Sequence, residues 1–161
     1  MADDDLEFIT PPHPLKSKVP DGAAGVVDNE VIERAQHAID NMTDEYLEWV
    51  QKDIAQIESA LDDVKANTGD RSEKLQDIFK VSHDIKGQGG SFGYDLMTII
   101  GNQICRLIEA ADPQDRNLVE VIDVHVGAMK LIVSTKLKKT GGREGELMLA
   151  GLEKVCGKIL G

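Results

Sequence analysis

The sequence predicts an all-α protein, an up-and-down antiparallel four-helix bundle with extra N- and C-terminal helices. Three observations favour this fold class. Apolar residues recur three and four positions apart over long stretches, which is typical of amphipathic helices. Short loops join these stretches. Almost none of the stretches shows the alternation of apolar and polar residues that is typical of a strand. Aromatic residues make up only 4% of the 161 residues, which is low for a β-sandwich or barrel.

The N-terminal part divides into a tail and two predicted helices. Residues 1–27 contain four of the five prolines and no sustained apolar period, so we expect an extended or disordered tail. A single helical domain is predicted over 28–161, beginning with a short helix at about 28–41 and a long helix at about 43–66. The long helix has an unbroken apolar stripe, formed by Leu47, Val50, Ile54, Ile57, Leu61 and Val64.

The next helix is expected over about 71–91. Asp70 and Glu73 form a potential capping pair at its start. Gly93 is expected to break the chain after it, because glycine is a poor helix former.

Three further helices complete the predicted fold, over about 94–111, 115–139 and 144–160. Asp112-Pro113 ends the first of them. The β-branched residues of 119–126 make a strand a rival for the second, but its length and the lack of other strands favour a helix. Gly141-Gly142 is expected to act as a hinge before the last helix.

Charge and cysteine content narrow the function classes. With 18 Lys and Arg against 29 Asp and Glu, the net charge of −11 disfavours nucleic acids and anionic membranes as partners of the whole surface. No apolar run approaches a membrane span, and the acidic N-terminus leads into no signal-peptide core, so we expect a cytoplasmic protein. Cys105 and Cys156 lie in apolar helical patterns, which predicts buried thiols rather than a disulfide.

The residues that suggest chemistry surround His83. Because helix positions three, four and seven apart share a face, His83 should lie at the edge of the buried face with one side of its ring in solvent. The residues expected on this face with it are Phe79, Lys80, Lys86, Gly87 and Gly90.

This face suits the transfer of a phosphoryl group. A neutral imidazole nitrogen is a good nucleophile near pH 7. Lys86, one turn away, can balance the phosphoryl charge of about −1.5 to −2. Gly87, Gly89 and Gly90 each cost a helix about 1 kcal/mol relative to alanine, and we interpret them as clearance for the surface of another protein.

Other readings of the motif are less well supported. The Gly-Lys-Ser/Thr order of a phosphate loop is absent, and Phe92 occupies a position where the dinucleotide pattern requires glycine. No second His or Cys lies at metal-ligand spacing from His83. His125, on an apolar helix, is expected to be a core or boundary histidine with satisfied hydrogen bonds.

The run His-x-x-Lys-Gly at 83–87, with Gly93 six residues further on, resembles the signature of histidine-containing phosphotransfer (HPt) domains. The predicted helices from 43 to 139 match the four-helix bundle of that family in order and length. The resemblance implies that His83 is phosphorylated on Nε2, that Lys86 holds the phosphoryl oxygens, and that Gly87 leaves room for the partner.

The resemblance also implies partners. Such domains relay a phosphoryl group between a histidine kinase or a receiver aspartate and another receiver aspartate, without kinase activity or a cofactor of their own. Mg²⁺ is expected on the partner receiver domain, and a monomer is the default. Phe79, Gly87, Gly90 and Phe92 would supply the apolar part of the docking surface, with Lys80 as well as Lys86 supplying positive charge.

One departure from the family pattern leaves alternatives open. Several members have a glutamine on the following helix near the histidine, and here Cys105 occupies that position. Asn102 and Gln103 are expected on other faces, and Gln88 is another possible substitute. The first alternative is therefore a non-catalytic partner-binding module with an inactive histidine, and the second is a small helical enzyme or metal-binding protein using His83, Asp84 and His125.

Overall fold

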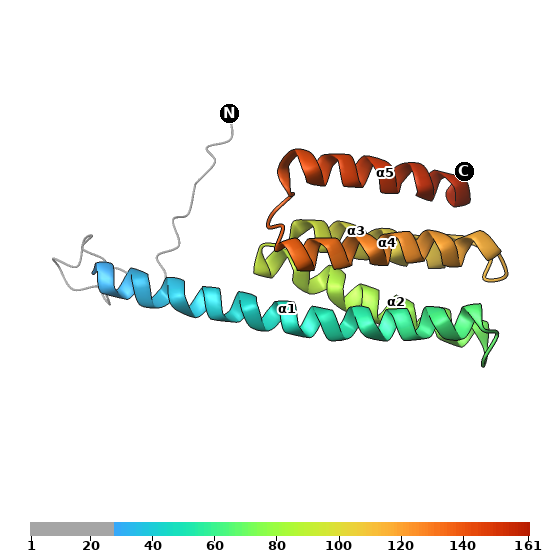
Figure 1. Ribbon diagram of the computed structural model, residues 1–161, viewed down its shortest axis with the longest axis horizontal. Coiled ribbons are helices and arrows are strands. Elements are labelled where there is room, and N and C mark those ends of the chain that lie inside the picture. Colours follow the sequence, from blue (N-terminus) through green and yellow to red (C-terminus); the bar gives the residue numbers. More distant parts are fainter. Residues whose placement is uncertain (1–27) are drawn as a thin grey trace, which may run out of the picture. The chain divides into compact units, whose positions relative to one another are not determined.

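The computed structural model describes residues 28–161, so the predicted tail at 1–27 lies outside the described residues. Within 28–161 the chain forms α-helices, one short 3₁₀ helix and no strand, which confirms the all-α class (Figure 1). The elements are α1 (Asn29–Lys65), α2 (Arg71–Gly89), η2 (Gly90–Phe92), α3 (Asp95–Ala110), α4 (Arg116–Thr135) and α5 (Gly142–Leu160).

Within the described residues, a division between two compact units falls inside α1, after Ala38, and residues 39–161 form the second unit. The predicted break between helices at 28–41 and 43–66 is wrong, because α1 is continuous there. Neither glycine nor proline interrupts this stretch. The Thr43 hydroxyl donates to the Ile39 carbonyl oxygen at 2.9 Å, so Thr43 is an interior helix residue and not a cap.

Most predicted helix ends agree with the structure. Asp70 caps α2, since its carboxylate accepts hydrogen bonds from the backbone N–H groups of Ser72 and Glu73 at 2.8 and 3.2 Å. Gly93 ends the turn after α2 with a φ of +77°. Helix α4 ends at Thr135 and not near 139, because Lys136 adopts a left-handed conformation that closes the helix.

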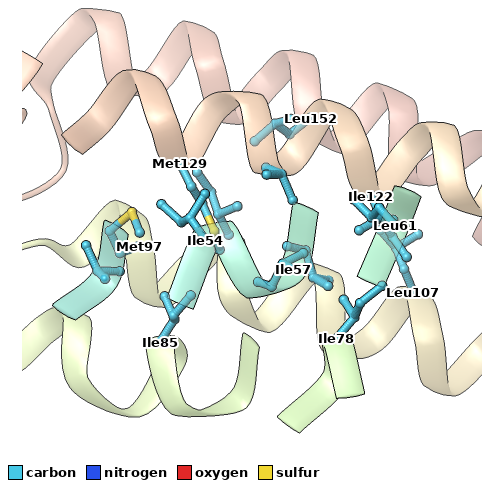
Figure 2. Packing of buried hydrophobic residues seen from close by; sticks show 14 of the residues in the cluster. Ile54, Ile57, Leu61, Ile78, Ile85, Met97, Leu107, Ile122, Met129 and Leu152 are labelled. Carbon is cyan, nitrogen blue, oxygen red and sulfur yellow. The ribbon is translucent and has the colours of Figure 1, made fainter. Parts of the chain in front are cut away.

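The core of the second unit lies between α1, α2, α3 and α4, as expected for the predicted bundle. Figure 2 shows Ile57 of α1, Ile78 of α2, Leu107 of α3 and Ile122 of α4 converging on one cluster. Helix α5 packs on α3 and α4 and adds Leu152 to that cluster. Burying such side chains completely stabilises the fold by about 1.5–3 kcal/mol each.

His125 lies in this core on the side covered by α5, and it is 0% exposed. Its Nδ1 donates to the Val121 carbonyl oxygen at 2.7 Å, so Nε2 is left to accept the Cys156 thiol proton at 3.3 Å. Burial lowers the pKa of His125, against the opposing effect of the Val121 carbonyl. The predictions of a core histidine and of buried free thiols at Cys105 and Cys156 are confirmed.

Helices α2 and α3 approach at backbone distance behind the His83 motif. A Cβ on Gly101 of α3 would lie 2.8 Å from the Ser82 carbonyl oxygen and 3.0 Å from the backbone nitrogen of Lys86. A Cβ on Gly89 would lie 2.9 Å from the Tyr94 carbonyl oxygen. The interpretation of Gly89 as clearance for a partner is therefore wrong, since Gly89 is buried and allows the two helices to pack closely.

We expect Gly101→Ala to lower the free energy of unfolding by about 1–3 kcal/mol, because the added methyl group must push two backbones apart. Urea denaturation followed by circular dichroism measures this change. Gly127→Ala is the matched control, because no atom lies within 4 Å of a Cβ at Gly127 on α4. The control should gain up to about 1 kcal/mol from helix propensity. An unchanged stability of Gly101→Ala would contradict the close approach.

Candidate functional site

His83 lies on the exposed side of α2, one position away from the buried Ser82. Its imidazole stacks against the Phe79 ring, with 6.1 Å between ring centroids and 26° between planes. Phe79 is partly buried and packs against the core. The ring is thus supported by Phe79 and remains accessible to solvent, as its predicted place at the edge of the buried face requires.

A surface depression of about 550 Å³ adjoins His83 between α2 and α3. It contains four of the predicted site residues, together with Asp84 and three residues of α3. The lining residues are Phe79, Lys80, His83, Asp84, Lys86, Asn102, Cys105 and Glu109. Imidazole, ammonium and amide groups, with the carboxylates of Asp84 and Glu109, therefore surround one space that is large enough for a phosphoryl group.

The two lysines of the depression differ in their pairing. Lys80 forms an ion pair with Asp77 at 3.4 Å, but both side chains are largely exposed, so the pair is weak. Lys86 forms no ion pair with any residue of 28–161 and is partly buried. Its ammonium group is therefore available to neutralise an anion beside His83.

Gly87 and Gly90 do not line the depression. No atom lies within 4 Å of a Cβ placed on Gly87, so packing within 28–161 does not require glycine there. A Cβ on Gly90 would meet the Thr98 hydroxyl at 3.6 Å, an ordinary contact. Both positions are exposed, as an approach surface for a partner requires. Their proposed role in docking stays a prediction.

Phe92 lies outside the depression, in an aromatic cluster with α1. Its ring stacks on Tyr46 with centroids 4.6 Å apart and meets the edge of Trp49 at 6.5 Å. Phe92 is partly buried and Trp49 about half exposed, so the cluster both packs the end of α2 and presents apolar surface. The docking role of Phe92 stays a prediction.

On the α3 side of the depression, Cys105 and Asn102 line the space next to His83. Cys105 is buried, and burial raises the pKa of its thiol, against a smaller opposing effect of the Lys86 charge. Its Sγ lies 3.9 Å from the Phe79 carbonyl oxygen, so the thiol forms a neutral floor. Asn102 lines the same depression, which corrects its expected place on another face. Gln103 does lie elsewhere, in a pocket with Cys156.

The sequence pattern could not identify Asn102, because which α3 residues face α2 depends on the rotation of the two helices about Gly101. Gln88, the other predicted substitute, is exposed and does not line the depression. A cluster of His83, Asp84 and His125 does not form, because both ring nitrogens of His125 are engaged in the core by Val121 and Cys156. Within 28–161 no three His, Cys, Asp or Glu residues are grouped so as to hold a metal ion.

Two further findings concern the whole described chain. No helix within 28–161 is long and apolar enough to span a membrane. A comparison with curated proteins and one with solved structures gave no match.

A comparison with protein families gave one result that coincides with the bundle. The family model for the Hpt domain matches residues 41–132, from within α1 to near the end of α4. The match covers more than half of the chain and includes His83, Lys86 and Gly87. It agrees with the span of about 43–139 that the motif and the helix order indicated. The all-α fold, the exposed histidine and this family match together show that the chain belongs to the HPt domain family.

Proposed function

We propose that this protein relays a phosphoryl group between a histidine kinase or a receiver aspartate and another receiver aspartate, with phosphohistidine at His83 as the intermediate. Domains of this family are phosphocarrier modules of phosphorelays and not autonomous enzymes. The observation that carries the proposal is the exposed imidazole of His83 beside an ammonium group, Lys86, that has no ion-pair partner within 28–161.

The transfer needs an unprotonated Nε2, so the ring proton must be on Nδ1. The Nε2 lone pair attacks phosphorus of the aspartyl phosphate, the N–P bond forms, the P–O bond to the aspartate breaks, and the carboxylate leaves with the electron pair. In the second transfer a receiver carboxylate attacks phosphorus and the imidazole leaves. Phe79 holds the ring in place, so less rotational freedom is lost at each step.

The Lys86 ammonium group lowers the cost of placing a dianion beside the ring. Lys86 is partly buried and lines the depression together with residues of α3. We expect the Mg²⁺ ion to be supplied by the receiver, whose aspartate must reach His83 across the open surface at Gly87.

The decisive test is phosphoryl acceptance at His83. Wild type should gain an acid-labile, base-stable phosphoryl group from phosphoramidate or from a phosphorylated receiver, and His83→Gln should gain none while keeping its helix content. Intact mass, lability and circular dichroism measure these outcomes. A labelled His83→Gln protein would remove His83 from the mechanism, and an unlabelled, folded wild type would leave the partner-binding module with an inactive histidine.

Lys86→Ala should slow transfer from a phosphorylated receiver by about tenfold or more, because a charge-assisted hydrogen bond contributes about 1.5–3 kcal/mol. Single-turnover transfer of labelled phosphate measures the rate. Lys80→Ala is the comparison, since it removes a second and more exposed lysine of the same depression. Equal effects of the two substitutions would show that general positive charge, and not Lys86, assists the reaction.

Gly87→Leu should separate chemistry from docking. The variant should still be labelled by phosphoramidate, which is small, and should lose most transfer from a receiver domain, because the leucine side chain would project into the space that the partner occupies. The control is Gly127→Leu on α4, another exposed helical glycine without neighbours within 4 Å. Unimpaired receiver transfer by Gly87→Leu would disprove the clearance role.

A further inference from the structure

The connection between α4 and α5 concentrates positive charge in an acidic protein. Residues 124–143 contain no Asp or Glu, although the chain as a whole has a net charge of −11. We call residues 136–143 the basic loop. Its cationic residues are Lys136, Lys138, Lys139 and Arg143, and all four are exposed.

The basic loop has a defined conformation in spite of its exposure. Lys136 and Lys139 adopt left-handed backbone conformations, with φ of 50° and 56°, which cost a residue other than glycine about 1 kcal/mol or more. Leu137, between them, is partly buried and packs against the core. The strained backbone therefore places apolar Leu137 inward and the lysines on either side of it outward.

Backbone hydrogen bonds attach the basic loop to the end of the His83 helix. The Lys139 N–H donates to the Gly93 carbonyl oxygen at 2.6 Å, and the Leu96 N–H donates to the Lys139 carbonyl oxygen at 3.3 Å. Gly93 closes the turn that follows α2. The loop is thus held beside the segment that contains Gly90 and Phe92, two residues of the predicted docking surface.

The distance from His83 to this segment is short on the scale of a protein interface. Gly90 follows His83 by two helical turns, about 10 Å along the axis. A standard interface covers about 800 Å² on each partner, a patch roughly 30 Å across. A receiver centred on His83 would therefore extend to the turn at Gly93 and place the basic loop at the rim of the contact.

The charges of the basic loop are largely uncommitted. Lys136 pairs with Asp44 at 3.4 Å, but both side chains are about two-thirds exposed, so the pair is weak. Lys138 and Lys139 form no ion pair within the described part of the chain. Charges of this kind at an interface rim chiefly raise the association rate with an oppositely charged surface.

We propose that the basic loop is a docking contact for an acidic surface patch beside the phosphorylated aspartate of the receiver partner. The inference rests on the proposed function and adds the electrostatic character of the partner. A localised acidic patch fits better than an extended polyanion, because the rest of this chain is acidic and would repel DNA or an anionic membrane.

The test compares two double substitutions that change the net charge equally. K138E/K139E reverses the basic loop, and K154E/K158E reverses two exposed lysines near the far end of α5. The probe is the receiver domain that exchanges phosphoryl groups fastest with wild type among those of the source organism. Its association rate constant is measured by stopped flow at 20 and 200 mM salt, next to phosphoramidate labelling of His83.

We expect K138E/K139E to associate about tenfold or more slowly at 20 mM salt, to lose most of the salt dependence of wild type, and to be labelled normally by phosphoramidate. K154E/K158E should associate within about twofold of wild type. Equal slowing of both variants would overturn the proposal, because net charge alone would then explain the effect. An association rate of wild type that does not depend on salt would overturn it as well.

The remaining outcomes separate this inference from the proposed function. Normal phosphoramidate labelling with unaltered receiver association of K138E/K139E would overturn only the basic-loop contact. Failure of wild type to be labelled or to bind any receiver would overturn both proposals. Loop-dependent binding to duplex DNA or to vesicles containing phosphatidylserine, without an effect on receiver association, would assign the loop to another partner and overturn the contact.

Discussion

The close approach of α2 and α3 is the constraint on which the rest of the site depends. Side chains normally keep helix axes 8–10 Å apart, and only glycine lets two backbones touch. Gly101 and Gly89 provide this contact at two places along the helix pair. Because Gly101 abuts the backbone of Ser82 and Lys86, the neighbouring α3 residues Asn102 and Cys105 are brought beside His83, and the shallow depression forms there.

The glycines of the motif consequently serve different physical purposes. Gly89 permits helix packing, and Gly93 adopts a left-handed conformation that ends the turn. Gly87 has neither role, since a side chain there would point into open space and would favour the helix. Gly127, Gly151 and Gly157 share this property, so the proposed docking role of Gly87 rests on its place one turn from His83 and not on its lack of contacts.

The site combines a rigid support with an accessible reactive group. The bundle core fixes α2 through Ile78 and Ile85, while His83 and Lys86 stand on its outer side. The C-terminal helix extends this support, because α5 packs on α3 and α4 and covers His125, which its Cys156 contacts. The connection that leads into α5 is bonded to the turn after α2, so the region outside the family match also contributes to the surface near the site.

Much of the fold and part of the site could be predicted from the sequence. The features that could be predicted depend on residues close together in the chain, and those that could not depend on contacts between helices. The helix periods, the Asp70 cap, the break at Gly93 and the shared face of His83 and Lys86 depend on residues three or four positions apart, which the sequence displays directly. The predicted break between 41 and 43 is absent, because no glycine or proline interrupts α1 and Thr43 bonds to Ile39 within the helix. Only the tertiary structure decided that Asn102 joins Cys105 beside His83, and that Lys139 bonds to Gly93. These contacts depend on how whole helices are rotated and shifted against one another. Close packing determines that arrangement, and the periodicity of the sequence does not.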